Sequence, residues 1–193
     1  MQQNDRFFVI TGGPGSGKST LTGALSELGI RHMPEGGRAI IQDQVAIGGS
    51  ALPWSDRRSF AELMMAWELR SYREALSHSG VVLFDRGIPD VVGYLTLCGL
   101  QIPPHMLRAA GSFRYNRQVF IAPPWPEIYV RDEDRKQSFD EAVATYDAMV
   151  RVYSEQGYEL TPLPKTSVAE RARFVMDRIG QARCQATTRV FSP

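Results

Sequence analysis

Residues 12–20 read Gly12-Gly13-Pro14-Gly15-Ser16-Gly17-Lys18-Ser19-Thr20. This stretch matches G-x-x-x-x-G-K-[ST], the Walker A pattern of phosphate-binding loops. Its context fits as well, because an apolar run at residues 7–11 is typical of a buried strand and leucines at helical spacing follow Lys18. The order of strand, glycine-rich loop and helix therefore predicts a loop that binds a nucleoside triphosphate.

Each residue type in this loop has a physical role toward phosphate. Glycines let the backbone approach the anion closely and present N–H donors, and the start of the helix directs its positive end at the same charge. Lys18 is expected to reach the β- and γ-phosphates, and the hydroxyl of Ser19 to bind Mg²⁺. We therefore assign nucleotide binding to all of residues 12–20, with Lys18 also catalytic and Ser19 also a metal ligand.

A dinucleotide-binding turn is the sharpest alternative for this loop. That turn reads G-x-G-x-x-G, and an acidic residue near the end of the second strand binds the ribose. Glu35 stands where that acid belongs, but Thr20 stands where the third glycine would fall after Gly15 and Gly17. The pattern therefore favours a nucleoside triphosphate.

Strand and helix patterns alternate along all 193 residues. Further strands are predicted at residues 30–33, 81–84, 119–121 and 159–163. Helices are predicted at residues 38–47, from residue 55, near 89–98 and 104–112, and at 138–155. Ser167 and Glu170 fit a capping box that opens a final helix, which is predicted to end near Gly180. The pattern predicts an α/β P-loop NTPase fold, three-layer α/β/α with a five-stranded, mainly parallel sheet. We expect one domain at residues 1–180 and a C-terminal tail at residues 181–193.

The composition argues against several classes of function. Hydrophobic residues make up 43% of the chain and charged residues 22%, which is ordinary for a globular protein. The formal net charge is +1, from 22 basic and 21 acidic residues, so no nucleic-acid or membrane-surface partner is expected. The sequence shows no signal peptide and no apolar run of membrane-spanning length, and Cys98 and Cys184 give no disulfide-scaffold or zinc pattern. We expect a cytoplasmic protein.

An Asp-Arg pair follows one of the predicted strands. Asp85 and Arg86 come directly after the apolar residues 81–84, and open α/β sheets bind ligands at the carboxyl ends of their strands. In P-loop proteins an acid at this place contributes to Mg²⁺ binding. We expect Asp85 to hold metal-bound water, to orient an acceptor hydroxyl, or both, with Arg86 beside it in catalysis and substrate binding. A strand-end salt bridge is the alternative.

Glu35 and Arg38 form a second candidate pair for the same crevice. Glu35 lies at the end of the second predicted strand, and Arg38 follows one helical turn later. We expect both to bind the substrate that accepts the phosphoryl group, with an exposed surface pair as the alternative. The sequence leaves open whether Asp85 or Glu35 orients the acceptor.

A charged segment lies between the strand at residues 119–121 and the helix at residues 138–155. We place a short lid at about residues 126–137, with Arg131 and Arg135 as catalytic residues that stabilise the transferring phosphoryl group and exclude water. A solvated helix start is the alternative, and the acidic residues 132–134 fit it. The position of the segment favours the lid.

The helix predicted from residue 55 carries an apolar stripe. Its members, at helical spacing, are Phe60, Met64, Trp67 and Ala75. We interpret this stripe as part of the protein core rather than as a ligand-binding surface.

Several short motifs, taken in order, give the chain a family resemblance. Besides the loop at residues 12–20 they are Glu35-Gly-Gly-Arg38, Phe84-Asp-Arg-Gly87, Pro123-Pro124-Trp125, the segment from Arg131 to Arg135, Tyr158, Leu163-Pro164 before Ser167-Val168, and Arg171. In these the chain resembles a compact P-loop family of predicted ATPases and kinases with an AAA-type domain label. That family is related to the ribosylnicotinamide kinase domain of the bacterial NAD-regulator protein and, more distantly, to adenylate-kinase-like small kinases. The resemblance covers about residues 5–180.

The resemblance implies a nucleoside- or nucleotide-kinase-like fold that uses ATP, with GTP as the alternative, and Mg²⁺ in phosphoryl transfer or hydrolysis. By this likeness Lys18 and Ser19 have phosphate and metal roles, Asp85 a metal or acceptor role, and Arg131 or Arg135 the lid role. The resemblance names no acceptor.

Three functions remain open at this point. The first is a small-molecule kinase, in which an acceptor enters between Glu35/Arg38 and Asp85/Arg86. The second is a nucleotide-dependent binding module or switch with slow or no hydrolysis. The third, a kinase of nucleic-acid ends, is disfavoured by the near-neutral charge. The oligomeric state is not predicted.

Overall fold

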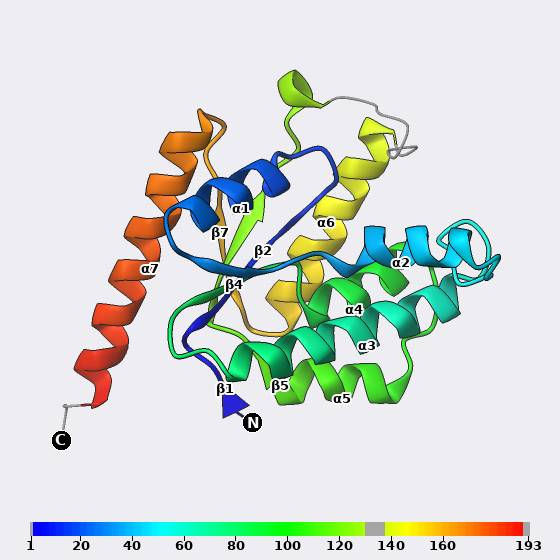
Figure 1. The fold of residues 1–193 in the computed structure, drawn as a ribbon, viewed down its shortest axis with the longest axis horizontal. Helices are drawn as coiled ribbons and strands as arrows, with labels where there is room; N and C mark the ends of the chain where they lie inside the picture. The colour runs from blue at the N-terminus through cyan, green and yellow to red at the C-terminus, as the bar shows by residue number, and fades with distance from the viewer. Residues whose placement is uncertain (1, 130–137, 191–193) are drawn as a thin grey trace.

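A parallel sheet of five strands forms the centre of the molecule (Figure 1). The computed structural model describes residues 2–129 and 138–190. In spatial order the sheet consists of β3 (Arg31–Met33), β4 (Val82–Asp85), β2 (Phe7–Gly12), β6 (Gln118–Ala122) and β7 (Glu159–Pro162). Each neighbouring pair is parallel, which confirms the predicted sheet. Because parallel strands all end at one edge of a sheet, the loops that follow them meet there.

The central strand β2 shows why both faces of the sheet are covered. Its side chains alternate between the faces: Phe7 and Val9 belong to one buried core, and Phe8 and Ile10 belong to the other. All four are fully buried. A continuous apolar strand of this kind needs a helical layer on each face, and this is the three-layer arrangement that the sequence predicts.

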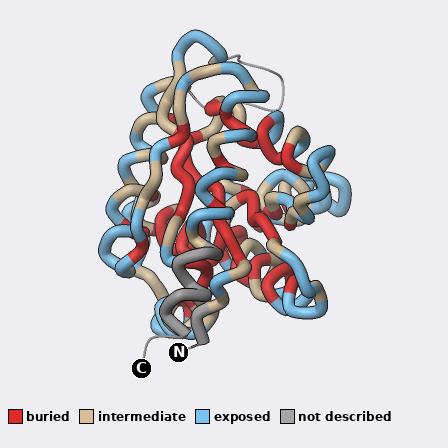
Figure 2. Tube along the Cα trace, turned by 90° about the vertical axis from the view of Figure 1, so that its left-hand side faces the viewer, coloured by how far each residue is buried: buried red, intermediate tan, exposed pale blue. Residues whose placement is uncertain are grey.

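Helices supply the two outer layers. On one face lie α1 (Lys18–Glu27) and α7 (Val168–Val190). On the other face lie α3 (Arg57–Leu76), α4 (Ile88–Leu97) and α6 (Phe139–Glu155), with α2 (Gly36–Ala46) packed against α3 and α5 (Pro104–Ser112) against α4. Figure 2 shows buried strands inside and exposed helix surfaces outside. No helix within the described residues combines the length and the apolar character needed to cross a membrane.

Three short elements are absent from the sequence predictions. β1 (Gln2–Gln3) and β5 (Phe113–Arg114) pair in parallel as a separate two-stranded sheet. A single 3₁₀ turn, η1 (Pro126–Ile128), follows β6. None of the three contains a run of apolar residues, so sequence patterning does not reveal them.

The predicted end of the last helix near Gly180 is wrong. α7 continues to Val190, into the segment that the sequence analysis treats as a tail at residues 181–193. A glycine inside a helix costs only about 1 kcal/mol relative to alanine. Residues 181–190 also contain no proline that would stop the helix, so Gly180 alone does not end it.

Candidate functional site

The loop between β2 and α1 has backbone conformations that glycine adopts most easily. Gly12 has a φ of 126°, and a Cβ at this position would lie 2.4 Å from the carbonyl oxygen of Ala122 on the neighbouring strand. Gly17 has a φ of 73° just before α1 begins, and a Cβ there would lie 2.7 Å from the guanidinium of Arg171. Both positions therefore need glycine, and the loop is held at the carboxyl end of the central strand.

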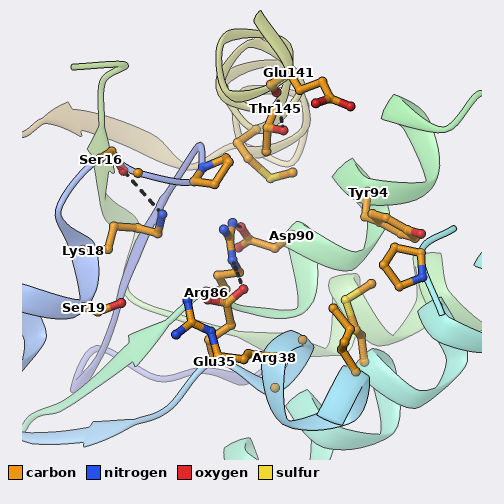
Figure 3. Close-up of a pocket in the computed structure, with 18 of the residues that line it drawn as sticks. Ser16, Lys18, Ser19, Glu35, Arg38, Arg86, Asp90, Tyr94, Glu141 and Thr145 are labelled. Carbon is orange, nitrogen blue, oxygen red and sulfur yellow. Dashed lines mark hydrogen bonds and ion pairs between the residues drawn. The ribbon is translucent and has the colours of Figure 1, made fainter. Parts of the chain in front are cut away.

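Lys18, the first residue of α1, folds back over this loop. Its Nζ donates hydrogen bonds to the carbonyl oxygens of Gly13 at 2.7 Å and Gly12 at 3.2 Å, and Figure 3 shows it directed toward Ser16. Burial and the charge of Arg86 lower the pKa of Lys18 to about 8. An anion bound at the loop favours the charged form, because an opposite charge raises the pKa of an ammonium.

Arg171, at the start of α7, supports the loop through its carbonyl oxygens. Its Nη2 and Nη1 donate hydrogen bonds to the carbonyl oxygens of Ser16 at 3.2 Å and Gly17 at 3.4 Å. Its guanidinium also lies 5.5 Å from the ring centroid of Trp125, at cation–π distance. The residue is buried. Arg171 is expected from sequence only as part of the family resemblance, so its contact with the loop is a finding of the structure.

Replacing Arg171 by methionine is expected to loosen the loop. The change leaves two carbonyl acceptors without their donor, which costs about 1–3 kcal/mol when such groups are buried. We expect a lower free energy of unfolding in urea and weaker ATP binding by titration calorimetry. The control is Arg173→Met, which removes an exposed arginine from the same helix. Equal effects of the two changes would contradict a supporting role for Arg171.

Arg86 connects three segments at the carboxyl edge of the sheet. Its Nε donates to Oε1 of Glu35 at 2.9 Å, and its Nη1 donates to the carbonyl oxygen of Gly12 at 3.1 Å and to Oδ1 of Asp90 at 3.3 Å. Its backbone has a φ of 73°, a left-handed conformation that costs a residue other than glycine about 1–2 kcal/mol. The hydrogen bonds hold Arg86 in this conformation and keep Glu35 beside the phosphate loop.

Asp90, in the first turn of α4, completes this cluster and is a residue that the sequence reasoning missed. Its buried carboxylate accepts hydrogen bonds from the hydroxyls of Thr11 and Tyr153, both at 2.6 Å, and from the backbone N–H of Gly87 at 2.9 Å. Together with Arg86 these contacts join α4 and α6 to the central strand. An acid at the start of a helix is an ordinary sequence feature, so only the fold shows that Asp90 is enclosed.

The two predicted acids lie in different environments. Burial alone would raise the pKa of Glu35, but the cations Arg86 and Lys18 hold that pKa below its usual value, and Glu35 lines the cavity described below. Asp85 ends β4, is buried, and does not line that cavity. Burial raises the pKa of Asp85, although Lys18 opposes this effect. Within the described residues, Oδ1 of Asp85 has no hydrogen-bond partner.

The residues at this edge fit a magnesium ion that arrives with a nucleotide. Mg²⁺ is typically bound by one or two carboxylates together with substrate phosphates and water. Across residues 2–129 and 138–190, no three His, Cys, Asp or Glu side chains gather into a metal site. Ser19, an exposed residue, and Asp85, whose Oδ1 has no partner, are therefore an incomplete donor set, which phosphate oxygens would complete. Because Asp85 does not line the cavity, it would act through metal-bound water.

A continuous cavity of about 1530 Å³ opens over this edge of the sheet. It begins at the phosphate loop, where residues 14–20 line it, and extends between α2, α3, α4 and α6. Figure 3 shows Lys18 and Ser19 on one side, Tyr94 on the opposite side, and Arg86 and Asp90 between them. The volume exceeds the roughly 300–1,000 Å³ of an ordinary ligand pocket, so the cavity has room for a nucleotide and a second molecule.

Of the remaining predicted site residues, some line the cavity and others lie outside the part of the chain that the structure describes. Arg38, on the first turn of α2, and Thr20 line the same cavity. Arg131 and Arg135 of the proposed lid lie outside the described residues. The apolar stripe on α3 is only partly core: Phe60 is buried, but Phe60 and Met64 also line the cavity. The interpretation of that stripe as core alone is therefore wrong, because the cavity opens directly over this face of α3.

Comparisons with known proteins agree with this geometry. A family model described as an AAA domain matches residues 7–171. An adenylate kinase from Treponema pallidum is 26% identical over 211 residues, which cover 91% of this chain and 99% of that protein. Two solved structures share the fold. The NadR protein in complex with NR has a TM-score of 0.69 and 15% identity, with coverage of 92% of this chain and 52% of that one. Deoxyadenosine kinase from M. mycoides has a TM-score of 0.61 and 12% identity, with coverage of 91% and 98%. The predicted family resemblance and the nucleoside- and nucleotide-kinase-like fold are both confirmed.

Proposed function

The chain belongs to this AAA-domain family, and on that premise we propose that it is a small-molecule kinase that transfers the γ-phosphoryl group of ATP, as its magnesium complex, to a metabolite or nucleoside-like acceptor. The observation that carries the proposal is the continuous cavity of about 1530 Å³, which extends from the phosphate loop to a second set of polar side chains. The adenylate kinase among its relatives supports the same reaction class. GTP is the alternative nucleotide.

The phosphate loop and Lys18 form the nucleotide end of the proposed site. The start of α1 offers backbone N–H groups and the positive end of its dipole to the phosphates. Lys18 supplies a positive charge that stabilises the charge developing on the transferring phosphoryl group. Asp85 and Ser19 would hold Mg²⁺, which when bound neutralises phosphate charge.

Glu35 is the residue that we assign to the acceptor. Its pKa is held below the usual value, so it is a carboxylate, and it lines the cavity whereas Asp85 does not. In the reaction the acceptor oxygen forms a bond to the γ-phosphorus and loses its proton to Glu35, while the bond from that phosphorus to the β–γ bridging oxygen breaks and ADP leaves. Arg86 holds Glu35 in place through the 2.9 Å ion pair.

The part of the cavity that Glu35, Arg38 and Arg86 line, which we call the acceptor end, distinguishes a kinase from the alternative function, a nucleotide-dependent switch. A switch needs a nucleotide site and a partner surface, but it needs no second compartment beside the γ-phosphate. Here Glu35, Arg38 and Arg86 line a continuation of the nucleotide cavity, which favours the kinase. Its catalysis would come mainly from positioning and charge stabilisation.

The proposal is tested by the rate of ADP release in the presence of candidate acceptors. We expect slow ATP turnover by the protein alone. With the matching compound from a panel of nucleosides, nucleoside monophosphates and hydroxy acids, turnover should rise to about 1–100 s⁻¹, the range of kinases. Tight ATP binding with no acceleration by any compound, and with nucleotide-dependent binding of a protein partner, would favour the switch instead.

A further inference from the structure

Glu68 is a buried carboxyl group at the acceptor end of the cavity. It lies on α3, one helical turn beyond Met64 and two beyond Phe60, and all three side chains line the cavity. Only 6% of its surface is exposed. A carboxyl group in such a position is expensive to bury, because an apolar surrounding removes its hydration without replacing it.

Within residues 2–129 and 138–190 the carboxyl group of Glu68 makes no hydrogen bond or ion pair, and its oxygens are not among the fully enclosed polar atoms. Asp90, by comparison, is equally buried but accepts hydrogen bonds from two hydroxyls and a backbone N–H. Most buried polar side chains in proteins are hydrogen-bonded. Because Glu68 faces the cavity, a bound molecule is the natural source of its missing partner.

The charges around Glu68 determine which molecule that is. Burial raises its pKa well above the usual value, and the carboxyl groups of Asp90, Glu35 and Asp85 raise it further, while Arg86 opposes them. Arg86 is already engaged by Glu35 and Asp90, so it is not a dedicated partner for Glu68. A bound cation would favour the ionised form of Glu68, because an opposite charge lowers the pKa of a carboxyl group. The acceptor end therefore favours cations and N–H donors and disfavours a second negative charge.

The wall beside Glu68 is apolar and aromatic. Phe60 and Tyr94 lie edge to face with ring centroids 5.5 Å apart, and Met64, Val91 and Met149 line the same cavity. Surfaces of this kind bury flat, apolar ring systems well. The expected ligand group is thus a flat ring system with apolar faces and with polar atoms at the edge that reaches Glu68.

We propose that Glu68 is the specificity-determining residue of the acceptor site, and that it binds a planar group that carries N–H donors and no negative charge. This inference rests on the proposed kinase function, because it describes the part of the acceptor remote from the phosphoryl transfer. It favours nucleoside-like acceptors with an amino, amide or cationic ring. It disfavours acceptors with a carboxylate or phosphate at that end.

Three small molecules of the same shape test the proposal by their binding affinities, with no catalytic reaction involved. Benzamidine, benzamide and benzoate share a ring and a planar head, but their charges are positive, neutral and negative. Binding is measured by ligand-observed NMR titration with the protein saturated by a non-hydrolysable ATP analogue, so that benzoate cannot occupy the phosphate loop. We expect benzamidine and benzamide to bind, and benzamidine to bind more tightly because its hydrogen bond to Glu68 is charged. Benzoate should bind at least about tenfold more weakly than either.

Glu68→Gln keeps the shape of the side chain and should remove the advantage of benzamidine over benzamide. Glu74→Gln is the matched control, because Glu74 is exposed on the same helix, and it should leave all three affinities unchanged. Affinity for the ATP analogue should be the same in both variants. Benzoate binding as tightly as benzamidine, no saturable binding of any probe, or unchanged selectivity in Glu68→Gln would each overturn the proposal. None of these outcomes depends on phosphoryl transfer, so failure of the kinase proposal is detected separately.

Discussion

Replacing Lys18 by alanine is expected to lower ATP turnover by about 10²- to 10³-fold, the loss typical when one preorganised donor to a developing negative charge is removed. The ammonium is held over the loop by the carbonyl oxygens of Gly12 and Gly13, so it is already positioned before a nucleotide binds. Its removal also takes away a positive charge that attracts phosphate. We therefore expect weaker ATP binding in addition to slower turnover, measured by calorimetry and by ADP release.

Arg108→Ala is the control for this prediction. It removes one positive charge from the exposed surface of α5, away from the cavity, and should leave both quantities unchanged. ATP affinity and turnover near the unsubstituted values in Lys18→Ala would contradict the assignment of residues 12–20 as the nucleotide site.

Replacing Asp85 by asparagine is expected to reduce turnover strongly while nucleotide binding is kept. The side chain keeps its size but loses the negative charge that would hold Mg²⁺. In a kinase we expect turnover to fall by about 10²-fold or more, the scale of losing a positioned catalytic group, and more Mg²⁺ to be needed for half-maximal rate. ATP affinity without Mg²⁺ should change little, because Asp85 does not line the cavity.

Asp43→Asn serves as the matched control, since Asp43 is exposed on α2. A nucleotide-dependent switch predicts a different result for Asp85→Asn, namely loss of Mg²⁺-dependent ordering with no change in the slow basal turnover. Unchanged magnesium dependence in Asp85→Asn would contradict the metal role of this residue.

The phosphate loop and the sheet could be predicted from sequence because their signals are local. The strand before Gly12 is continuously apolar, and the glycines and Lys18 follow at fixed spacing. Glu35 and Arg86 could be placed in one crevice because the carboxyl ends of parallel strands meet at one edge. In the structure their side chains form an ion pair of 2.9 Å.

Asp90, Arg171 and Glu68 could not be assigned roles from sequence, because their roles depend on burial and on contacts between distant segments. Asp90 accepts a hydrogen bond from Tyr153 of α6, and Arg171 donates one to the carbonyl oxygen of Ser16 in the loop before α1. Glu68 lies within a helix whose apolar stripe, which includes Phe60 and Met64, is typical of a core-facing surface. A cavity over that stripe is a property of the assembled layers and leaves no periodic signal.

The most direct test of the central claim, that one cavity brings ATP and a small acceptor together for phosphoryl transfer, is to follow the γ-phosphoryl group itself. The protein is incubated with Mg²⁺, a pool of small metabolites and ATP labelled in that group, and the labelled products are separated. We expect label in a new phosphoester, in an amount equal to the acceptor-stimulated ADP, and its loss in Lys18→Ala. Label found only in inorganic phosphate, at a rate that the metabolites do not change, would contradict the claim.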